Sequence, residues 1–214
     1  ATCPVASPQS PTLSTRSVAG RRGPDFVATL SNTPSSTVYG YGDVTLVSDG
    51  LYAASYTSPR VGQYSLEVQV AEWGGLTGEY FDNNELVGPP RFVQIDNVID
   101  FSWANDGSEE YFSSVRWTGY IKPSFDETYT FKADVNGDLK LWIENELIID
   151  HQHDKDSEYI KVSNTTSDVL KANQLIRIKI EHRKNTDSQT FRLLWQSTTQ
   201  PLSVIDQYRL YSKA

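Results

Sequence analysis

The sequence contains no methionine and a single cysteine, Cys3, in 214 residues. One thiol cannot form an internal disulfide, so Cys3 is free, paired with another chain or repeat, or reduced in a cytosolic protein. Since a chain without methionine cannot be a complete translation product, we expect a mature form, a fragment or one unit of a longer protein. In the last case Cys3 is a candidate for a disulfide between consecutive units.

Basic charge and long apolar stretches are also scarce. The chain has 19 Lys and Arg against 27 Asp and Glu, which gives a formal net charge of −8. This balance argues against nucleic acid as a partner, because binding to the phosphate backbone needs a basic surface. No apolar run is long enough to span a bilayer and no signal-peptide pattern stands at the start, so we expect no membrane insertion by this segment.

The residues that are abundant favour an all-β fold. Aromatic residues make up 12% of the chain, and 13 glycines and 10 prolines punctuate it every few residues. This composition is typical of many short strands joined by turns. We predict two β-sandwich domains in series, residues 1–73 with an N-terminal tether and residues 74–214, with the joint at 71–75.

A first alternating series lies within residues 25–70. Phe26, Ala28 and Leu30 alternate with polar residues, and DGLYAASYTSPRVGQYSLEVQV combines two Tyr-bearing strands with Asp-Gly and Pro-x-x-Gly turns. These segments resemble the filamin-type immunoglobulin-like repeat over about residues 10–70. The resemblance implies an immunoglobulin-like sandwich.

A stronger alternating series begins at residue 76. It predicts strands with one buried face near 115–121, 139–143 and 176–180, and a hairpin through 144–146. We expect the following side chains to be buried: Val115, Trp117, Leu141, Ile143, Ile176, Ile178, Ile180 and Leu193. Three cationic neighbours on the same strands are expected to be exposed: Arg177, Lys179 and Arg192.

The second half carries several spaced motifs, GLTGEYFDN, SVRWTGYIKPS, ETYTFKADVNGDLKLWIENELIIDH and FRLLWQ, in this order. Together they resemble the protective-antigen-type (PA14) domain over about residues 76–212. The resemblance implies a β-sandwich that is frequently extracellular, binds carbohydrate in some members and is structural in others.

The segment Asp134-Val-Asn136-Gly-Asp138 places three oxygen-bearing side chains at alternate positions, as a calcium loop does. Calcium-dependent adhesins of the resembled family use two adjacent aspartates, and that pair is absent here. Asp134, Asn136 and Asp138 are therefore a candidate Ca2+ site, with an Asn-Gly turn bearing solvated carboxylates as the alternative.

Two histidines, His151 and His153, follow an apolar strand and suggest zinc, with His182 as a distant third ligand. An exposed loop is the alternative. No catalytic set is recognisable, since Glu109 and Glu110 are adjacent and their side chains diverge, and no serine lies in a G-x-S-x-G motif. We therefore predict that the chain is not an enzyme.

Aromatic and modifiable side chains provide the remaining candidates. Trp117 and Trp195 are assigned to the core, whereas Trp103 and Trp142 are candidates for stacking against glycans. Asn164 begins the single N-glycosylation sequon, Asn-Thr-Thr.

These features favour a non-enzymatic structural module of an extracellular or cell-surface glycoprotein, as a tandem-repeated unit of a filament. The expected partners are copies of the chain joined end to end, or other extracellular glycoproteins, and residues 1–15 suit an edge strand added to a neighbouring unit. The alternative is a calcium-dependent carbohydrate-binding adhesin, a lectin, that binds glycans through the candidate calcium site.

Overall fold

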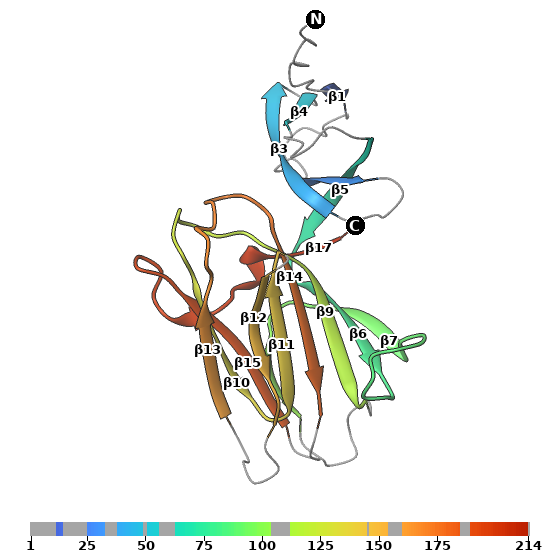
Figure 1. The fold of residues 1–214 in the computed structure, drawn as a ribbon, viewed down its shortest axis with the longest axis vertical. Helices are drawn as coiled ribbons and strands as arrows, with labels where there is room; N and C mark the ends of the chain where they lie inside the picture. Colours follow the sequence, from blue (N-terminus) through green and yellow to red (C-terminus); the bar gives the residue numbers. More distant parts are fainter. Residues whose placement is uncertain are drawn as a thin grey trace, which may run out of the picture. The chain divides into compact units, whose positions relative to one another are not determined.

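The chain folds into two compact units, Ala1–Glu72 and Trp73–Lys213, in a computed structural model (Figure 1). The structure describes residues 12–14, 25–32, 38–48, 51–55, 63–103, 112–144, 146–153, 160–184 and 189–213. The fold is all-β, as the sequence predicts, and one short 3-10 turn, η1 (Gln207–Arg209), interrupts the described strands. In the described part of the chain, no helix is long and apolar enough to cross a membrane.

The first unit has its described strands in the order β1-β4-β3-β2-β5. They are β1 (Thr12–Ser14), β2 (Asp25–Asn32), β3 (Val38–Ser48), β4 (Leu51–Ser55) and β5 (Tyr64–Trp73). The long β3 pairs with β2 through its first half and with β4 through its second half. Phe26 packs edge-on against the buried Tyr52 with ring centroids 4.6 Å apart, and Ala28 is also buried.

The larger sheet of the second unit has the antiparallel order β7-β6-β9-β14-β11-β12. β17 pairs with the end of β9 that β6 leaves open. The bounds are β6 (Leu76–Phe81), β7 (Phe92–Asp96), β9 (Ser114–Ile121), β11 (Asp138–Ile143), β12 (Glu146–His151), β14 (Ile176–Arg183) and β17 (Leu210–Lys213). The β11–β12 pair is the hairpin that the sequence predicts.

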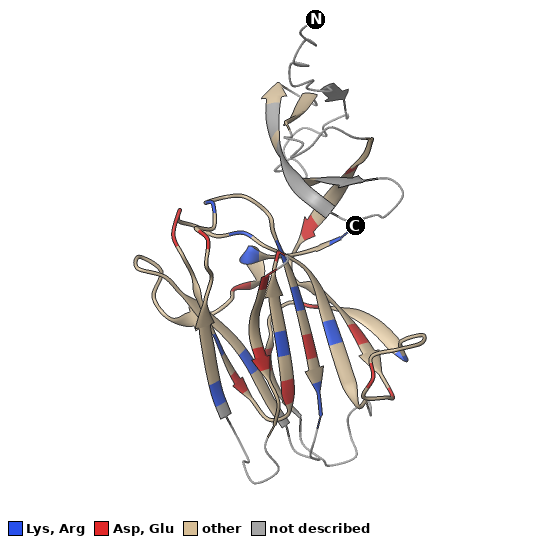
Figure 2. Cartoon of the chain, viewed as in Figure 1, with Lys and Arg blue, Asp and Glu red and all other residues tan. Residues whose placement is uncertain are grey.

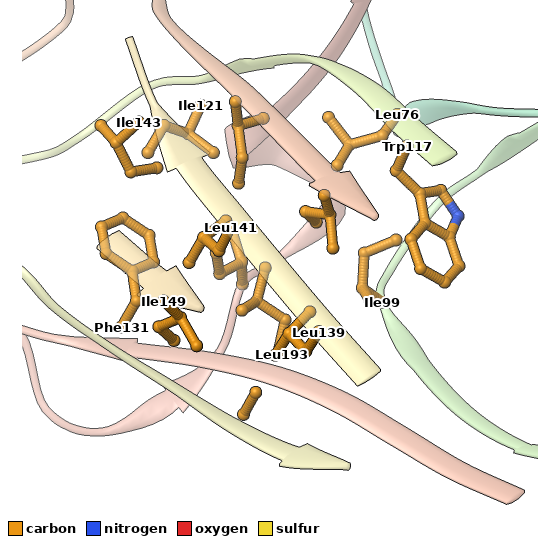
Figure 3. Close-up of a cluster of buried hydrophobic side chains, with 14 of the residues drawn as sticks. Leu76, Ile99, Trp117, Ile121, Phe131, Leu139, Leu141, Ile143, Ile149 and Leu193 are labelled. Atoms are coloured by element: carbon orange, nitrogen blue, oxygen red, sulfur yellow. The ribbon is translucent and has the colours of Figure 1, made fainter. Parts of the chain in front are cut away.

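The smaller sheet of the second unit has the order β13-β10-β15, and β8 and β16 pair with different parts of β15. The bounds are β8 (Asp100–Trp103), β10 (Thr130–Val135), β13 (Ile160–Thr165), β15 (Gln189–Gln196) and β16 (Ser203–Val204). Apolar side chains from both sheets form one buried cluster, so the second unit is a β-sandwich (Figure 3).

The alternation of the sequence gives the correct buried faces in the second unit. All eight side chains predicted to be buried are at most 8% exposed. The three cations predicted to be exposed point to the outer faces but are half-buried. Two examples show why: Lys179 lies over the ring of Trp142, and Arg192 pairs with Asp134.

The outer face of the larger sheet carries a row of alternating charges that crosses five strands. In register, Glu79 of β6 lies opposite Arg116, Arg116 opposite Glu181, Glu181 opposite Lys140, and Lys140 opposite Asp150 of β12. Figure 2 shows the red and blue bands alternating across these strands. The charged atoms of Arg116 lie 3.7 Å from those of Glu79 and 3.2 Å from those of Glu181. Opposite charges at cross-strand positions favour this register over one shifted by a single residue.

Candidate functional site

The candidate calcium residues lie where β10 turns into β11, and Asp134 is engaged there by an arginine. Asp134 Oδ2 accepts hydrogen bonds from Arg192 Nη2 at 2.7 Å and from Arg192 Nε at 3.2 Å. The neighbours Ala133 and Val135 are fully buried, so strand alternation places Asp134 on the outer face of the smaller sheet. The guanidinium therefore neutralises the carboxylate that a calcium ion would need.

Asp138 lies on the other sheet. It alternates with the buried Leu139 and so belongs to the outer face of the larger sheet, where its Oδ1 accepts the backbone N–H of His153 at 2.9 Å. Between the aspartates, the backbone N–H of Asn136 donates to Thr190 O at 3.1 Å. Gly137 is required in this turn, because its φ is +121° and a Cβ would lie 2.3 Å from the carbonyl oxygen of Arg183.

These contacts do not fit the predicted calcium site. The two aspartates belong to the outer faces of different sheets, and Asp134 already forms an ion pair with the guanidinium of Arg192. Within the described ranges, no group of three or more His, Cys, Asp or Glu side chains is arranged to hold a metal ion.

The histidines lie at the same end of the sandwich but do not converge. His151 and His182 occupy positions on either side of Leu139 in the larger sheet. His182 is fully buried, with its Nδ1 3.0 Å from Asp138 O and its ring stacked on Phe191 at 5.1 Å. This histidine is part of the core, so the three residues do not form the zinc site considered from the sequence.

The other two histidines differ from His182 in their hydrogen bonding. Both are half-buried, which differs from the exposed loop considered as the alternative to zinc. His151 Nε2 and His153 Nδ1 are shielded from solvent and have no hydrogen-bond partner among the residues that the structure describes. Buried polar atoms are normally hydrogen-bonded, so these two nitrogens are unusual. We call His151 and His153 the histidine pair.

The tryptophans were predicted to divide into core residues and exposed residues that stack on glycans, and the structure confirms the core residues. Trp117 and Trp195 are 0% and 2% exposed and belong to the core. Trp142 is half-buried, and the ammonium nitrogen of Lys179 lies 3.6 Å from its ring centroid, so one face of the ring is already covered by a cation. The side chain of Trp103 lies outside the described residues.

Several N-terminal and loop predictions fall outside the described part. Cys3, Glu109 and Glu110 are among these residues. Residues 12–14, at the end of the segment expected to add to a neighbouring unit, form β1 and pair with β4 of the same unit. An added strand from a neighbour would therefore have to come from residues 1–11.

A buried carboxylate that the sequence analysis missed lies at the end of β7. Asp96 is 6% exposed and accepts three hydrogen bonds, from Trp117 Nε1 at 2.6 Å, from Tyr80 Oη at 2.7 Å and from Gln94 Nε2 at 2.8 Å. We call Asp96 and its three donors the aspartate hub. Burial first, and then the charge of Asp96, raise the pKa of the Tyr80 phenol above its ordinary range.

The aspartate hub requires a glycine beside it. A Cβ on Gly78 would lie 2.4 Å from Asp96 Oδ2 and 3.1 Å from Trp117 Cδ1. The alternation of β7 gave no signal for the hub, since the apolar Val93 and Ile95 are exposed and Asp96 lies opposite the fully buried Leu76 in register. An acidic residue at an inward position of a strand needs buried donors, and Tyr80 and Trp117 supply them.

The fold and these contacts define an antiparallel β-sandwich with a buried aspartate that accepts three side-chain hydrogen bonds. The PA14 domain family matches residues 74–208, and the chain belongs to this family. The family assignment agrees with the resemblance of residues 76–212, whereas the filamin-type resemblance of the first unit finds no support in this match.

Three known proteins illustrate the relationship. Anti-sigma-I factor RsgI3 of Acetivibrio thermocellus is 32% identical over 143 residues, which are 64% of this chain and 21% of that protein. An anti-sigma factor domain-containing protein from Clostridium clariflavum has a TM-score of 0.57 at 21% identity, covering 95% of this chain and 83% of that one. A PA14 sugar-binding domain from an RTX adhesin has a TM-score of 0.52 at 12% identity, covering 66% and 99%. The chain therefore spans about a fifth of the length of RsgI3. The Clostridium clariflavum structure and the RTX adhesin domain share the fold of this chain.

Proposed function

We propose that the chain is a non-enzymatic structural module of an extracellular or cell-surface protein. The observation that carries the proposal is the pairing of polar groups within the framework. The row of charges on the larger sheet is paired across strands, Asp134 is paired with Arg192, and Asp96 is held by three donors. Charges that satisfy one another hold strands in register and offer little to a substrate.

A module of this kind acts by joining to neighbours. We propose that consecutive copies join end to end into a filament, with the segment before β1 contacting the next unit and Cys3 forming a disulfide across the joint in an oxidising compartment. Electron microscopy of a protein with two consecutive copies tests this assembly. A fixed repeat that Cys3→Ser loosens under oxidising conditions supports it, and freely jointed beads would overturn it.

The histidine pair favours a second candidate function, carbohydrate recognition at the end of the sandwich where β12 ends. Both imidazole rings are half-buried, and an imidazole nitrogen can hydrogen-bond a polar ligand such as a sugar hydroxyl. The name of the RTX adhesin domain, a sugar-binding domain of the same fold, supports this candidate.

A glycan array separates the two candidates. The structural proposal predicts no specific binding by the wild-type chain. Binding that resists a chelator, is lost in His151→Leu/His153→Leu and persists in the matched control Gln152→Ala would instead establish the second candidate. Binding that a chelator abolishes would restore the calcium-dependent alternative and contradict our interpretation of the Asp134–Arg192 pair.

A further inference from the structure

The sequon residue Asn164 lies on an open side of the sandwich. It belongs to β13, which pairs with β10 as its one neighbour among the described strands, and the residue is exposed. β12 likewise has β11 as its one described strand partner, at the edge of the other sheet. Backbone groups at such edges are available to other chains unless something covers them.

The side chain of Asn164 bridges the two edge strands. Its Nδ2 donates to the carbonyl oxygen of Ile148 on β12 at 2.8 Å, and its Oδ1 accepts the backbone N–H of Thr165 at 2.8 Å. A glycosylated asparagine keeps one hydrogen on Nδ2. The bridge to Ile148 is therefore compatible with a sugar on the same nitrogen, provided that the remaining hydrogen is the one that donates.

The hydroxyl of the sequon is not available in the folded unit. Thr166 is 4% exposed, and its Oγ1 donates to Asp168 O at 2.9 Å and accepts the backbone N–H of Tyr129 at 3.1 Å. A transferase that must engage this hydroxyl cannot reach it once Tyr129 and Thr166 have packed. Glycan transfer to this sequon must therefore precede folding of the sandwich.

Exposed apolar side chains stand next to this bridge in the sequence. Leu147, the neighbour of Ile148, is 43% exposed, and Val169, three residues after Thr166, is 47% exposed. A glycan on Asn164 would lie on the side of the sandwich where these residues and the two strand edges are found. Such a cover would prevent edge-to-edge association of copies at this side.

We propose that Asn164 is N-glycosylated before the second unit folds and that the glycan covers the β12–β13 side of the sandwich. The inference rests on the proposed extracellular role, because N-linked transfer takes place on the secretory route. In the reaction, Nδ2 forms a bond to the anomeric carbon of a glycosyl donor activated by a diphosphate group. The bond from that carbon to the diphosphate oxygen breaks, the diphosphate leaves with the electron pair, and a base of the transferase takes up the proton that Nδ2 loses.

The first test is translation of the full chain behind a signal sequence in the presence of endoplasmic-reticulum microsomes. The expected result is a mass increase by one oligosaccharide that an enzyme releasing N-linked sugars removes. Asn164→Gln and Thr166→Val should abolish the increase, whereas Thr166→Ser and the exposed control Asn84→Gln should retain it. A translocated wild-type chain without added mass would overturn the proposal, and because transfer occurs before folding, a variant that folds poorly still gives an answer.

The second test addresses the timing. The folded, unmodified chain and a peptide of residues 160–170 are each given to the purified transferase with its lipid-linked donor. We expect the folded chain to react on the order of a thousandfold more slowly or worse, since only the transiently unfolded fraction is accessible. Equal rates would overturn the claim that Thr166 is inaccessible. Because the signal sequence enforces translocation, neither result depends on where the native protein resides, which the filament and glycan experiments address separately.

Discussion

The buried aspartate hub and the half-buried histidine pair lie in the same sandwich, and they differ in how their hydrogen bonds are satisfied. Asp96 accepts from three side chains that reach it from β6, β7 and β9. Within the described part of the chain, His151 Nε2 and His153 Nδ1 form no hydrogen bond. A satisfied buried group stabilises the fold, whereas an unsatisfied one costs about 1 to 3 kcal/mol. We therefore expect the aspartate hub to contribute to stability and the histidine pair to be the candidate for recognition.

The largest effect is expected from removing the acceptor of the aspartate hub. Asp96→Ala leaves Tyr80 Oη and Trp117 Nε1 buried without an acceptor, and two such donors cost about 2 to 6 kcal/mol. Urea unfolding measures this loss. The matched control is Asp82→Ala, which breaks an exposed pair with Arg91 and is expected to cost about 0 to 1 kcal/mol. Similar losses for the two variants would contradict a structural role for the hub.

A smaller effect is expected from filling the space beside the hub. Gly78→Ala puts a methyl group against Asp96 Oδ2 and the ring of Trp117, which overpacks the site and costs about 1 to 3 kcal/mol. The neighbouring Thr77→Ala, on the opposite face of β6, should cost less than about 1 kcal/mol. Thermal or urea unfolding of both variants distinguishes crowding of the hub from a general effect on the strand.

Alkaline pH should weaken the hub through Tyr80. Its pKa is raised in the folded state, so above a pH of about 10 the unfolded chain loses this proton while the folded chain keeps it. Stability from this group is complete below that pH and falls by about 1.4 kcal/mol per pH unit above it. In urea titrations between about pH 9 and 11, the difference in stability between the wild type and Tyr80→Phe should therefore shrink. A constant difference would show that the phenol titrates alike in both states.

Sequence alone predicts the buried faces of the second unit, because successive side chains of a strand point to opposite faces and one face of each strand packs on a continuous core. Val115, Trp117 and Ile178 are buried for that reason. The pairing of Asp134 with Arg192 was not predictable in the same way, because these residues are 58 positions apart and meet through the β10–β15 register. The alternation of residues does not reveal strand order or register. These two properties bring Arg192 to Asp134, and so they explain why the predicted calcium site does not fit the structure.

The aspartate hub also depends on strand order and register, which the sequence pattern does not reveal. On β7 the apolar Val93 and Ile95 are exposed and Asp96 is buried, so alternation of the sequence would place Asp96 on the wrong face. Two of its three donors come from β6 and β9, whose order in the sheet was needed to bring them together. The histidine pair was singled out from the sequence for metal binding. That two of its nitrogens have no hydrogen-bond partner among the described residues became evident only from the folded structure.

The most direct test of this account compares Tyr80→Phe with His151→Leu by urea unfolding at pH 7.5. Each change removes a polar atom that is shielded from solvent and leaves an apolar side chain of similar size. Tyr80→Phe breaks a hydrogen bond to a carboxylate and should cost about 1.5 to 3 kcal/mol. His151→Leu removes an unsatisfied nitrogen and should be neutral or stabilise the chain by up to about 1 kcal/mol. A loss for His151→Leu as large as that for Tyr80→Phe would contradict the distinction between a satisfied framework and an unsatisfied end of the sandwich.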